Sequence, residues 1–192
     1  MPRNMLAPPA ANMLARATNE NAYFAAMLAK ATKDYPFISQ HNPMVFMGAD
    51  PSRDYAETWP TMEEGGPDRP RPKNLPLDRV GVEVFRPDSF GASDLAAELL
   101  HVDPVANTTR AQMLKMLTPA QIARLKQEAR DYQSTIDRGQ GEESAMRNAM
   151  DSALRGYAMQ QWPAEANQAM GYTPAQLQML DALKRYVTTG KK

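Results

Sequence analysis

Proline is the residue that most restricts how this chain can fold. The 192 residues include 16 prolines, and most of them lie before Pro104. Each proline fixes its own backbone φ and removes one hydrogen-bond donor, so it interrupts helices and central strands. We therefore expect short, irregular elements before Pro104 and regular helices after it.

The C-terminal half carries regular helical signals. Thr118-Pro119-Ala120-Gln121 has the form of a capping box with proline at the first helical position, and Thr173-Pro174-Ala175-Gln176 repeats it letter for letter. We attribute the repeat to shared capping chemistry, because the residues around the two copies do not align further. Apolar residues at helical spacing then predict helices over 119–136, 142–162 and from 174 onward.

The first 17 residues are expected to form an extended arm. Three early prolines oppose a helix start, and the segment is more apolar than a solvated tail should be. We therefore expect the arm to lie against a neighbouring subunit. The apolar residues that would make this contact are Met1, Met5, Leu6, Met13 and Leu14.

Residues 18–192 are predicted to form a single, mainly helical domain. A helix capped by Thr18 is expected to run to Asp34, and residues 37–53 are expected to be irregular. A further helix should run from Ser93 to about Val102, where Asp103-Pro104 stops it.

Two short β-like segments lie between these helices. Tyr55–Trp59 and Val80–Phe85 alternate in polarity and predict a two-stranded ribbon. The predicted fold class is therefore α+β and predominantly helical, with four to five helices, this small ribbon and the extended N-terminal arm.

The segment that joins the two predicted strands is a proline-rich loop at 60–76. Its sequence PDRPRP favours polyproline II, a conformation that docks on aromatic surfaces. The more economical interpretation is a loop held on its own domain. If it does bind a partner, the residues we would assign to the contact are Trp59, Arg69 and Arg71.

Composition excludes several classes of protein. There are 22 basic and 22 acidic residues with no long run of either sign, so a broad nucleic-acid surface is not expected. There is no cysteine, hence no disulfide or thiolate metal site, and no stretch approaches the roughly 20 apolar residues of a membrane span. The N-terminus does not have the pattern of a signal peptide. No cofactor is implied.

One short pattern suggests an enzyme. Ala97-Glu98-Leu99-Leu100-His101 differs by one residue from the zinc-binding motif His-Glu-x-x-His, in which two histidines hold the metal and the glutamate activates water. Here Ala97 replaces the first histidine. If the chain were an enzyme, Glu98 and His101 would be its catalytic residues. If it held a metal, the ligands would be His101, Asp103 and His41. A favourable interaction with the helix dipole explains a histidine at the end of this helix equally well. An enzyme is therefore the less favoured interpretation.

Several short motifs follow one another in a recognisable order. They are Glu57-Thr58-Trp59-Pro60, Glu63-Glu64-Gly65-Gly66, Pro67–Pro72, Gly81–Phe85, Ala97–Pro104, Leu117-Thr118-Pro119, Arg155-Gly156-Tyr157 and Tyr172-Thr173-Pro174. This order resembles a family of small virion-associated proteins of tailed bacteriophages, podovirus-like in type. The resemblance covers about 37–187, and no functional residues carry over from it.

The resemblance implies a structural or accessory virion protein. Its partners would be capsid, portal, tail or ejection proteins, including copies of itself in an oligomeric assembly, and it would be assembled into the particle in the host bacterial cytoplasm. Two alternatives stay open from the sequence. One is a relative of a metallopeptidase or cell-wall hydrolase with a degenerate zinc-binding core, and the other is a small phage regulator that binds a host protein.

Overall fold

The structure is a computed structural model, and it describes the backbone of residues 9–48, 55–61, 65–66, 69–135, 142–159 and 169–192. The fold is α+β and predominantly helical, as predicted. Within these ranges six α-helices are present, slightly more than the four to five expected. They are α1 Pro9–Asp34, α2 Ala92–Leu100, α3 Pro104–Lys115, α4 Pro119–Thr135, α5 Glu142–Ala158 and α7 Pro174–Thr189.

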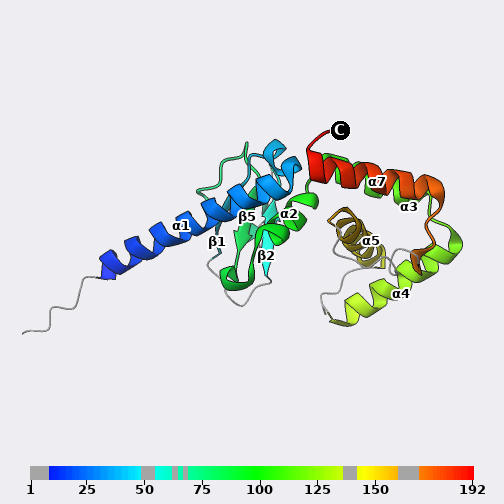
Figure 1. Cartoon of the computed structure of the whole chain (residues 1–192). Helices are drawn as coiled ribbons and strands as arrows, with labels where there is room; N and C mark the ends of the chain where they lie inside the picture. Colours follow the sequence, from blue (N-terminus) through cyan, green and yellow to red (C-terminus); the bar gives the residue numbers. More distant parts are fainter. Residues whose placement is uncertain (1–8, 49–54, 62–64, 67–68, 136–141, 160–168) are drawn as a thin grey trace, which may run out of the picture.

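The elements are arranged in two lobes (Figure 1). The N-terminal lobe contains α1, the 3-10 helix η1 at Pro36–Gln40, a small sheet and α2, and the C-terminal lobe contains α3, α4, α5 and α7. Between the described elements of the two lobes, the most extensive packing joins η1 to α7. The junction also contains the short connection from α2 to α3 and the polar contacts around it, and the buried apolar residues of the two lobes form one continuous core.

The sheet of the N-terminal lobe has three strands in the order β1-β5-β2. The predicted ribbon is present, because β2 (Ala56–Trp59) pairs antiparallel with β5 (Gly81–Val84). The third strand, β1 (Met44–Met47), pairs parallel with β5 and lies in a region that we predicted to be irregular. That prediction was wrong because a run of four apolar residues between Pro43 and Gly48 has neither the alternation of a strand nor the spacing of a helix. The strand forms because β5, which is distant in the sequence, pairs with it.

The core of this lobe lies between the sheet, α1 and α2. Val82, Val84, Leu95 and Leu99 are fully buried. At Gly81 an added Cβ would lie 2.3 Å from a side-chain carbon of Leu75, so a larger residue at position 81 would displace this buried leucine. Phe24, Met27 and Ala31 pack α1 on the same core.

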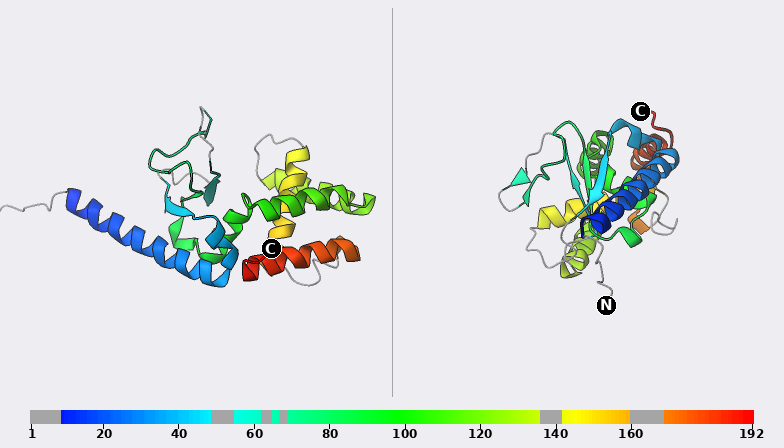
Figure 2. Two further views of the ribbon diagram at one scale, coloured as in Figure 1. Left: turned by 90° about the horizontal axis from the view of Figure 1, so that it is seen from above. Right: turned by 90° about the vertical axis from the view of Figure 1, so that its left-hand side faces the viewer.

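The predicted extended arm is wrong from Pro9 to Ala17, because α1 begins at Pro9. Proline is well tolerated in the first turn of a helix, and the alanines, Met13 and Leu14 that follow have high helix propensity. The N-terminal half of α1 extends beyond the lobe (Figures 1 and 2). Of the predicted contact residues, Met1, Met5 and Leu6 lie outside the described residues, and Met13 and Leu14 lie in α1 with side chains outside the described set.

The C-terminal lobe confirms the helices predicted from the two capping boxes. Leu125, Met150, Leu154 and Leu180 are buried between α4, α5 and α7. The last helix ends at Gly190, whose φ of 68° is the left-handed conformation usual after a helix. None of the described helices is both long and apolar enough to cross a membrane.

Candidate functional site at the junction of the lobes

The two lobes are connected by three residues, His101-Val102-Asp103. His101 follows the last residue of α2, and Asp103 is the N-cap of α3, with its side chain accepting a hydrogen bond from the backbone N–H of Ala106. His101 and Asp103, two of the predicted metal ligands, therefore lie where the chain passes from one lobe to the other.

Asp103 is completely buried and contacts both lobes. Its Oδ1 accepts from the N–H of Ala106 at 2.8 Å. Its Oδ2 lies 2.8 Å from Nε2 of His41, at the end of η1, and accepts from the hydroxyl of Tyr186 in α7, also at 2.8 Å. One carboxylate thus joins η1 to the start of α3 and the end of α7.

The surroundings of Asp103 favour its charged form. Burial raises the pKa of this carboxyl, but the hydrogen bonds from His41, Ala106 and Tyr186 outweigh burial, and the pKa lies below its usual value. Burial and the hydrogen bond to Asp103 raise the pKa of Tyr186. Nearby, Nε2 of Gln40 donates to the carbonyl of Gly190 at 2.7 Å, which adds a second link between η1 and α7.

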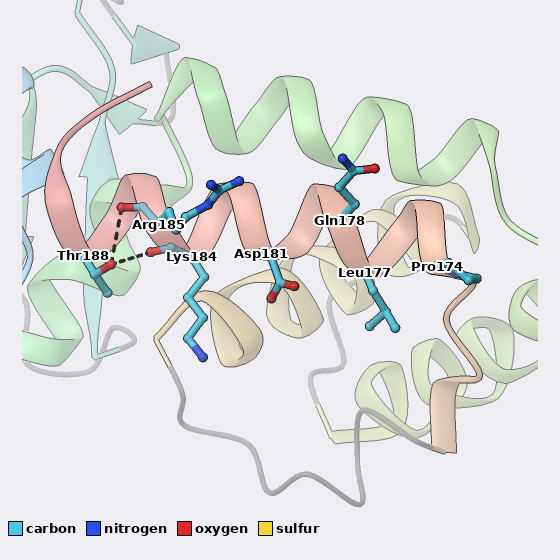
Figure 3. A pocket seen from close by; sticks show the side chains of 7 residues that line it. All are labelled: Pro174, Leu177, Gln178, Asp181, Lys184, Arg185 and Thr188. Carbon is cyan, nitrogen blue, oxygen red and sulfur yellow. Dashed lines mark hydrogen bonds between the residues drawn. The ribbon is translucent and has the colours of Figure 1, made fainter.

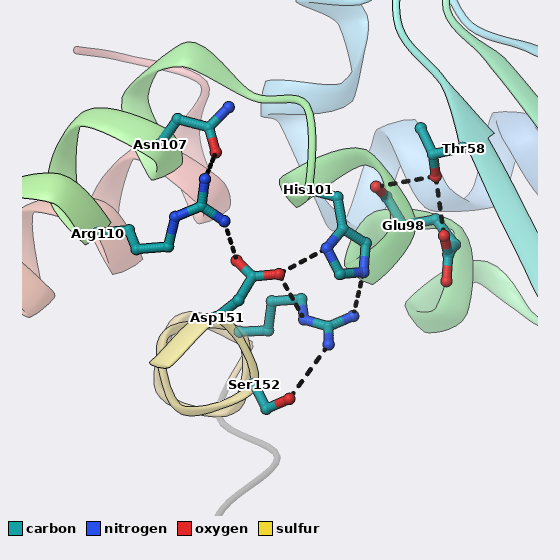
Figure 4. A network of polar contacts seen from close by, with 8 residues as sticks. Thr58, Glu98, His101, Asn107, Arg110, Asp151 and Ser152 are labelled. Carbon is teal, nitrogen blue, oxygen red and sulfur yellow. Dashed lines mark hydrogen bonds and ion pairs between the residues drawn. The ribbon is translucent and has the colours of Figure 1, made fainter. Parts of the chain in front are cut away.

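His101 makes the second contact between the lobes (Figure 4). Its Nδ1 lies 2.5 Å from Oδ2 of Asp151 in α5, and its Nε2 lies 2.8 Å from Nη1 of Arg155. A guanidinium only donates, so Nε2 is the acceptor and the ring proton lies on Nδ1, which donates to Asp151. The lone pair that a catalytic histidine would use as a base is therefore occupied by Arg155.

Asp151 is held among cationic groups. Burial raises the pKa of this carboxyl, but the hydrogen bond from His101 and the positive charges of Arg155 and Arg110 outweigh burial and lower it. Nη1 of Arg110 lies 3.6 Å from Oδ1, and Nε of Arg155 lies 3.8 Å from Oδ2. The guanidinium groups are further positioned by Asn107, which accepts from Arg110 at 2.8 Å, and by Ser152, which accepts from Arg155 at 3.4 Å.

We call these two clusters the interlobe latch. The first consists of Asp103, His41 and Tyr186, and the second of Asp151, His101, Arg155 and Arg110. In each cluster a buried aspartate of the C-terminal lobe is bound by a histidine of the N-terminal lobe, and the chain contains only these two histidines.

The predicted catalytic pair, Glu98 and His101, is joined only through the backbone, where the N–H of His101 donates to the carbonyl of Glu98 at 3.1 Å, and the two side chains have different partners. Oε2 of Glu98 accepts from the hydroxyl of Thr58 in β2 at 2.8 Å, and Thr58 also donates to the backbone carbonyl of Glu98 at 3.2 Å. Glu98 therefore ties α2 to the sheet, while His101 contacts α5. The arrangement of both side chains is explained by packing of the lobes.

The predicted metal ligands are divided between the two clusters. His41 and Asp103 bond to each other, but His101 pairs with Asp151. Within the part of the chain that the structure describes, no group of three or more histidine, aspartate or glutamate side chains is placed to hold a metal ion.

The residues predicted for partner binding near the loop are used internally. Trp59 is 3% exposed and its Nε1 donates to Oε2 of Glu83 at 3.2 Å, so it is a packing residue and its assignment as a contact was wrong. Arg69 lies in β4 (Arg69–Pro70), which pairs with β3 (Gly65–Gly66), and its side chain is outside the described set.

Arg71 holds the proline-rich loop on its own lobe. Its guanidinium donates to the backbone carbonyls of Pro60 at 2.6 Å, Pro76 at 2.7 Å, Arg79 at 2.8 Å and Leu75 at 3.3 Å. The described part of the loop therefore matches the more economical of the two interpretations, in which it is held on its own domain.

A shallow pocket of about 740 Å³ lies apart from the latch, along the exposed face of α7 (Figure 3). Its carboxylate, Asp181, accepts from the hydroxyl of Tyr157 at 2.6 Å. Thr188 at its other end donates to backbone carbonyls of its own helix. The pocket is lined by Pro174, Leu177, Gln178, Asp181, Lys184, Arg185 and Thr188. It contains no latch residue, so the two features are distinct.

Sequence reasoning missed four members of the latch: Asp151, Arg155, Arg110 and Tyr186. The available signal was in α5, where Asp151 and Arg155 are four residues apart among the buried Met150, Ala153 and Leu154. Opposite charges at this spacing lie on one helix face, and an aspartate within an apolar face needs a partner.

A scan against protein-family models, a search of curated proteins and a search of solved structures found no match for this chain.

Proposed function

We propose that this protein is a non-enzymatic assembly protein that binds further copies of itself through the N-terminal half of α1. The observation that carries the proposal is the length of α1 relative to its lobe. The second half of the helix packs on its lobe through three buried residues, Phe24, Met27 and Ala31. The first half extends away from both lobes (Figures 1 and 2).

The apolar face of α1 continues into the extended half. Ala17 precedes Phe24 by seven residues, about two helical turns, and Met13 precedes it by eleven, about three turns. By backbone spacing both positions fall on the same face as Phe24 and Ala31. A helix face that is apolar beyond the edge of its own domain is stabilised when another surface covers it.

A second copy of α1 suits this face. In an antiparallel pair centred on Thr18, position 16 of each helix lies level with position 20 of the other. Arg16 of one copy is then opposite Glu20 of its partner, twice by symmetry, so the negative charge that Glu20 places on this face, four residues before Phe24, meets a positive charge. The segment from Pro9 to Glu20 is only about 18 Å long, so we expect weak, concentration-dependent association.

The setting that we propose is the virion of a tailed phage, which rests on the motif resemblance between 37 and 187. Weak self-association is effective in a particle, where copies are held at high local concentration. In this proposal the partners are further copies of the chain together with capsid, portal, tail or ejection proteins.

The test of self-association compares Ala17→Asp with Ala15→Asp by light scattering over a range of concentrations. The two substitutions have the same cost in helix propensity, but only position 17 lies on the apolar face. We expect oligomers for the wild type and for Ala15→Asp, and monomers for Ala17→Asp. A wild type that stays monomeric at every concentration, or equal loss in both variants, contradicts the proposal.

The test of the setting is mass spectrometry of purified phage particles. The chain should be present in stoichiometric amount relative to other minor virion proteins, and its absence would favour the regulator that binds a host protein. Metal analysis of the same protein, with His101→Ala as control, tests the remaining alternative, a relative of a metallopeptidase or cell-wall hydrolase. Stoichiometric zinc that is lost in the variant would favour the metallopeptidase relative.

A further inference from the structure

We propose that the interlobe latch is acid-sensitive and that the lobes separate about the segment His101–Asp103 when the carboxylates of Asp103 and Asp151 take up protons. This inference does not depend on self-association. It rests on the placement of both aspartates between the lobes and on the kind of group that surrounds each of them.

Asp103 is surrounded by donors. The backbone N–H of Ala106, the hydroxyl of Tyr186 and Nε2 of His41 all lie 2.8 Å from its two oxygens. A carboxylate accepts these hydrogen bonds with its negative charge, and charge-assisted hydrogen bonds are about twice as strong as neutral ones. Taking up a proton removes that charge and weakens all three contacts, and the contact with His41 is the one that crosses between the lobes.

Asp151 is surrounded by positive charge. Arg110 on α3, Arg155 on α5 and His101 at the end of α2 all face its carboxylate. Neutralising this one anion leaves two guanidinium groups close together without their counterion. Arg155 then repels Arg110 and loses its support beside His101, so the second contact between the lobes also weakens.

The pH window follows from the direction in which the two carboxyl groups are shifted. Both have a pKa below the ordinary value in the folded protein. A carboxyl with a lowered folded pKa contributes stability above its unfolded value of about 3.9 and loses that stability as the pH falls through the folded value. The latch is therefore closed at neutral pH and opens below about pH 4.

Each lobe has apolar contacts that do not depend on these protons. In the N-terminal lobe Val82, Val84 and Leu95 are fully buried, and in the C-terminal lobe Leu125 and Met150 are. The core is continuous across the junction, where the rings of Phe37 and Tyr186 lie 5.8 Å apart, and this apolar contact has to open together with the latch. The helices of both lobes should therefore persist after the latch opens. Separation of the lobes and loss of helix are then two events that occur at different pH values.

The experiment measures energy transfer between dyes on the two lobes of the full chain. The protein has no cysteine, so Lys33→Cys on α1 and Gln178→Cys on α7, both at exposed positions, give unique labelling sites. We expect transfer to fall below about pH 4 while the far-UV helical signal is retained. Transfer that stays constant until the helical signal is lost would overturn the proposal.

Two variants separate the latch from general acid denaturation. Asp151→Asn leaves the Asp103 cluster in place, and we expect it to raise the population of separated lobes at pH 7 by about tenfold or more. Asp78→Asn removes an exposed carboxylate of the N-terminal lobe and should leave the transfer profile unchanged. Identical profiles for Asp151→Asn and the wild type would contradict the role of the second cluster, as would an equal change in Asp78→Asn.

Discussion

The side-chain amides of Gln121 and Gln176 bond to each other in both directions. Nε2 of Gln121 donates to Oε1 of Gln176 at 2.9 Å, and the reverse bond is 3.1 Å. Gln121 also donates to the carbonyl of Gly171 at 3.1 Å, and Gln176 donates to that of Met116 at 3.0 Å. Met116 and Gly171 each lie two residues before the capping threonine of their own turn, so the two turns contact each other with local twofold symmetry.

This pairing predicts that Gln176→Glu is destabilising although it changes one atom. A carboxylate cannot donate, so the bonds to Met116 and Gln121 are lost and a charge is placed at a fully buried position. We expect the free energy of unfolding, measured by urea denaturation, to fall by about 2–4 kcal/mol. The matched control is Gln178→Glu, two residues along the same helix and exposed, which should change it by less than about 0.5 kcal/mol.

The coupling between the two glutamines is measured by a double-mutant cycle. Gln121→Ala and Gln176→Ala should each be destabilising, and the double variant should cost less than their sum, because the second substitution removes a group that the first has already left unpaired. Additive effects would show that the two amides contribute independently and would contradict the reciprocal arrangement.

Arg71 gives a second prediction, for the proline-rich segment. Arg71→Lys keeps the charge but cannot donate to four carbonyls at once, because an ammonium is not a planar fork. We expect the loop to open locally, so that limited proteolysis cleaves between Pro60 and Arg79 several times faster than in the wild type. Lys73→Arg, at an exposed position of the same loop, is the control, and equal cleavage of the two variants would argue against the role of Arg71.

Tyr157 gives a third prediction, for alkaline pH. Burial and the hydrogen bond to Asp181 raise the pKa of its hydroxyl to about 12. A folded pKa above the unfolded value of about 10 means that this group contributes stability below pH 10 and loses it as the pH rises through 12. Asp181→Asn should move the ionisation of Tyr157 towards lower pH in a titration followed by tyrosinate absorbance. An unchanged titration would show that Asp181 has no part in the shift.

Elements with a local cause could be predicted from the sequence. Thr118 and Thr173 cap helices at the predicted positions, and β2 and β5 pair as expected, because capping chemistry and alternating polarity operate over a few residues. The contact between the two capping boxes was not predicted. It depends on how the helices pack, and identical letters in two places give no indication that their side chains meet.

Elements stabilised from a distance could not be predicted. Strand β1 forms because β5 lies beside it. The start of α1 at Pro9 has a local cause instead, since proline is favoured in the first turn of a helix, and our prediction treated this proline as a break. His101 was singled out for its resemblance to a zinc ligand, but its partner Asp151 lies 50 residues away. The motif drew attention to His101, but it gave no indication of the partner. The contact of His101 with Asp151 depends on where α5 lies relative to the end of α2, and only the structure shows it.

Copies of the chain that pair through the extended half of α1 can be captured by cross-linking through single cysteines. In the cysteine-free chain, Ala17→Cys places one thiol on the apolar face of α1, and Ala15→Cys places the same thiol on the opposite face. Both proteins would be treated with a short bis-maleimide and the dimer fraction measured. If the copies pair as proposed, we expect covalent dimers for Ala17→Cys and monomers for Ala15→Cys. Monomers for both variants, or dimers in equal amounts, would contradict this pairing.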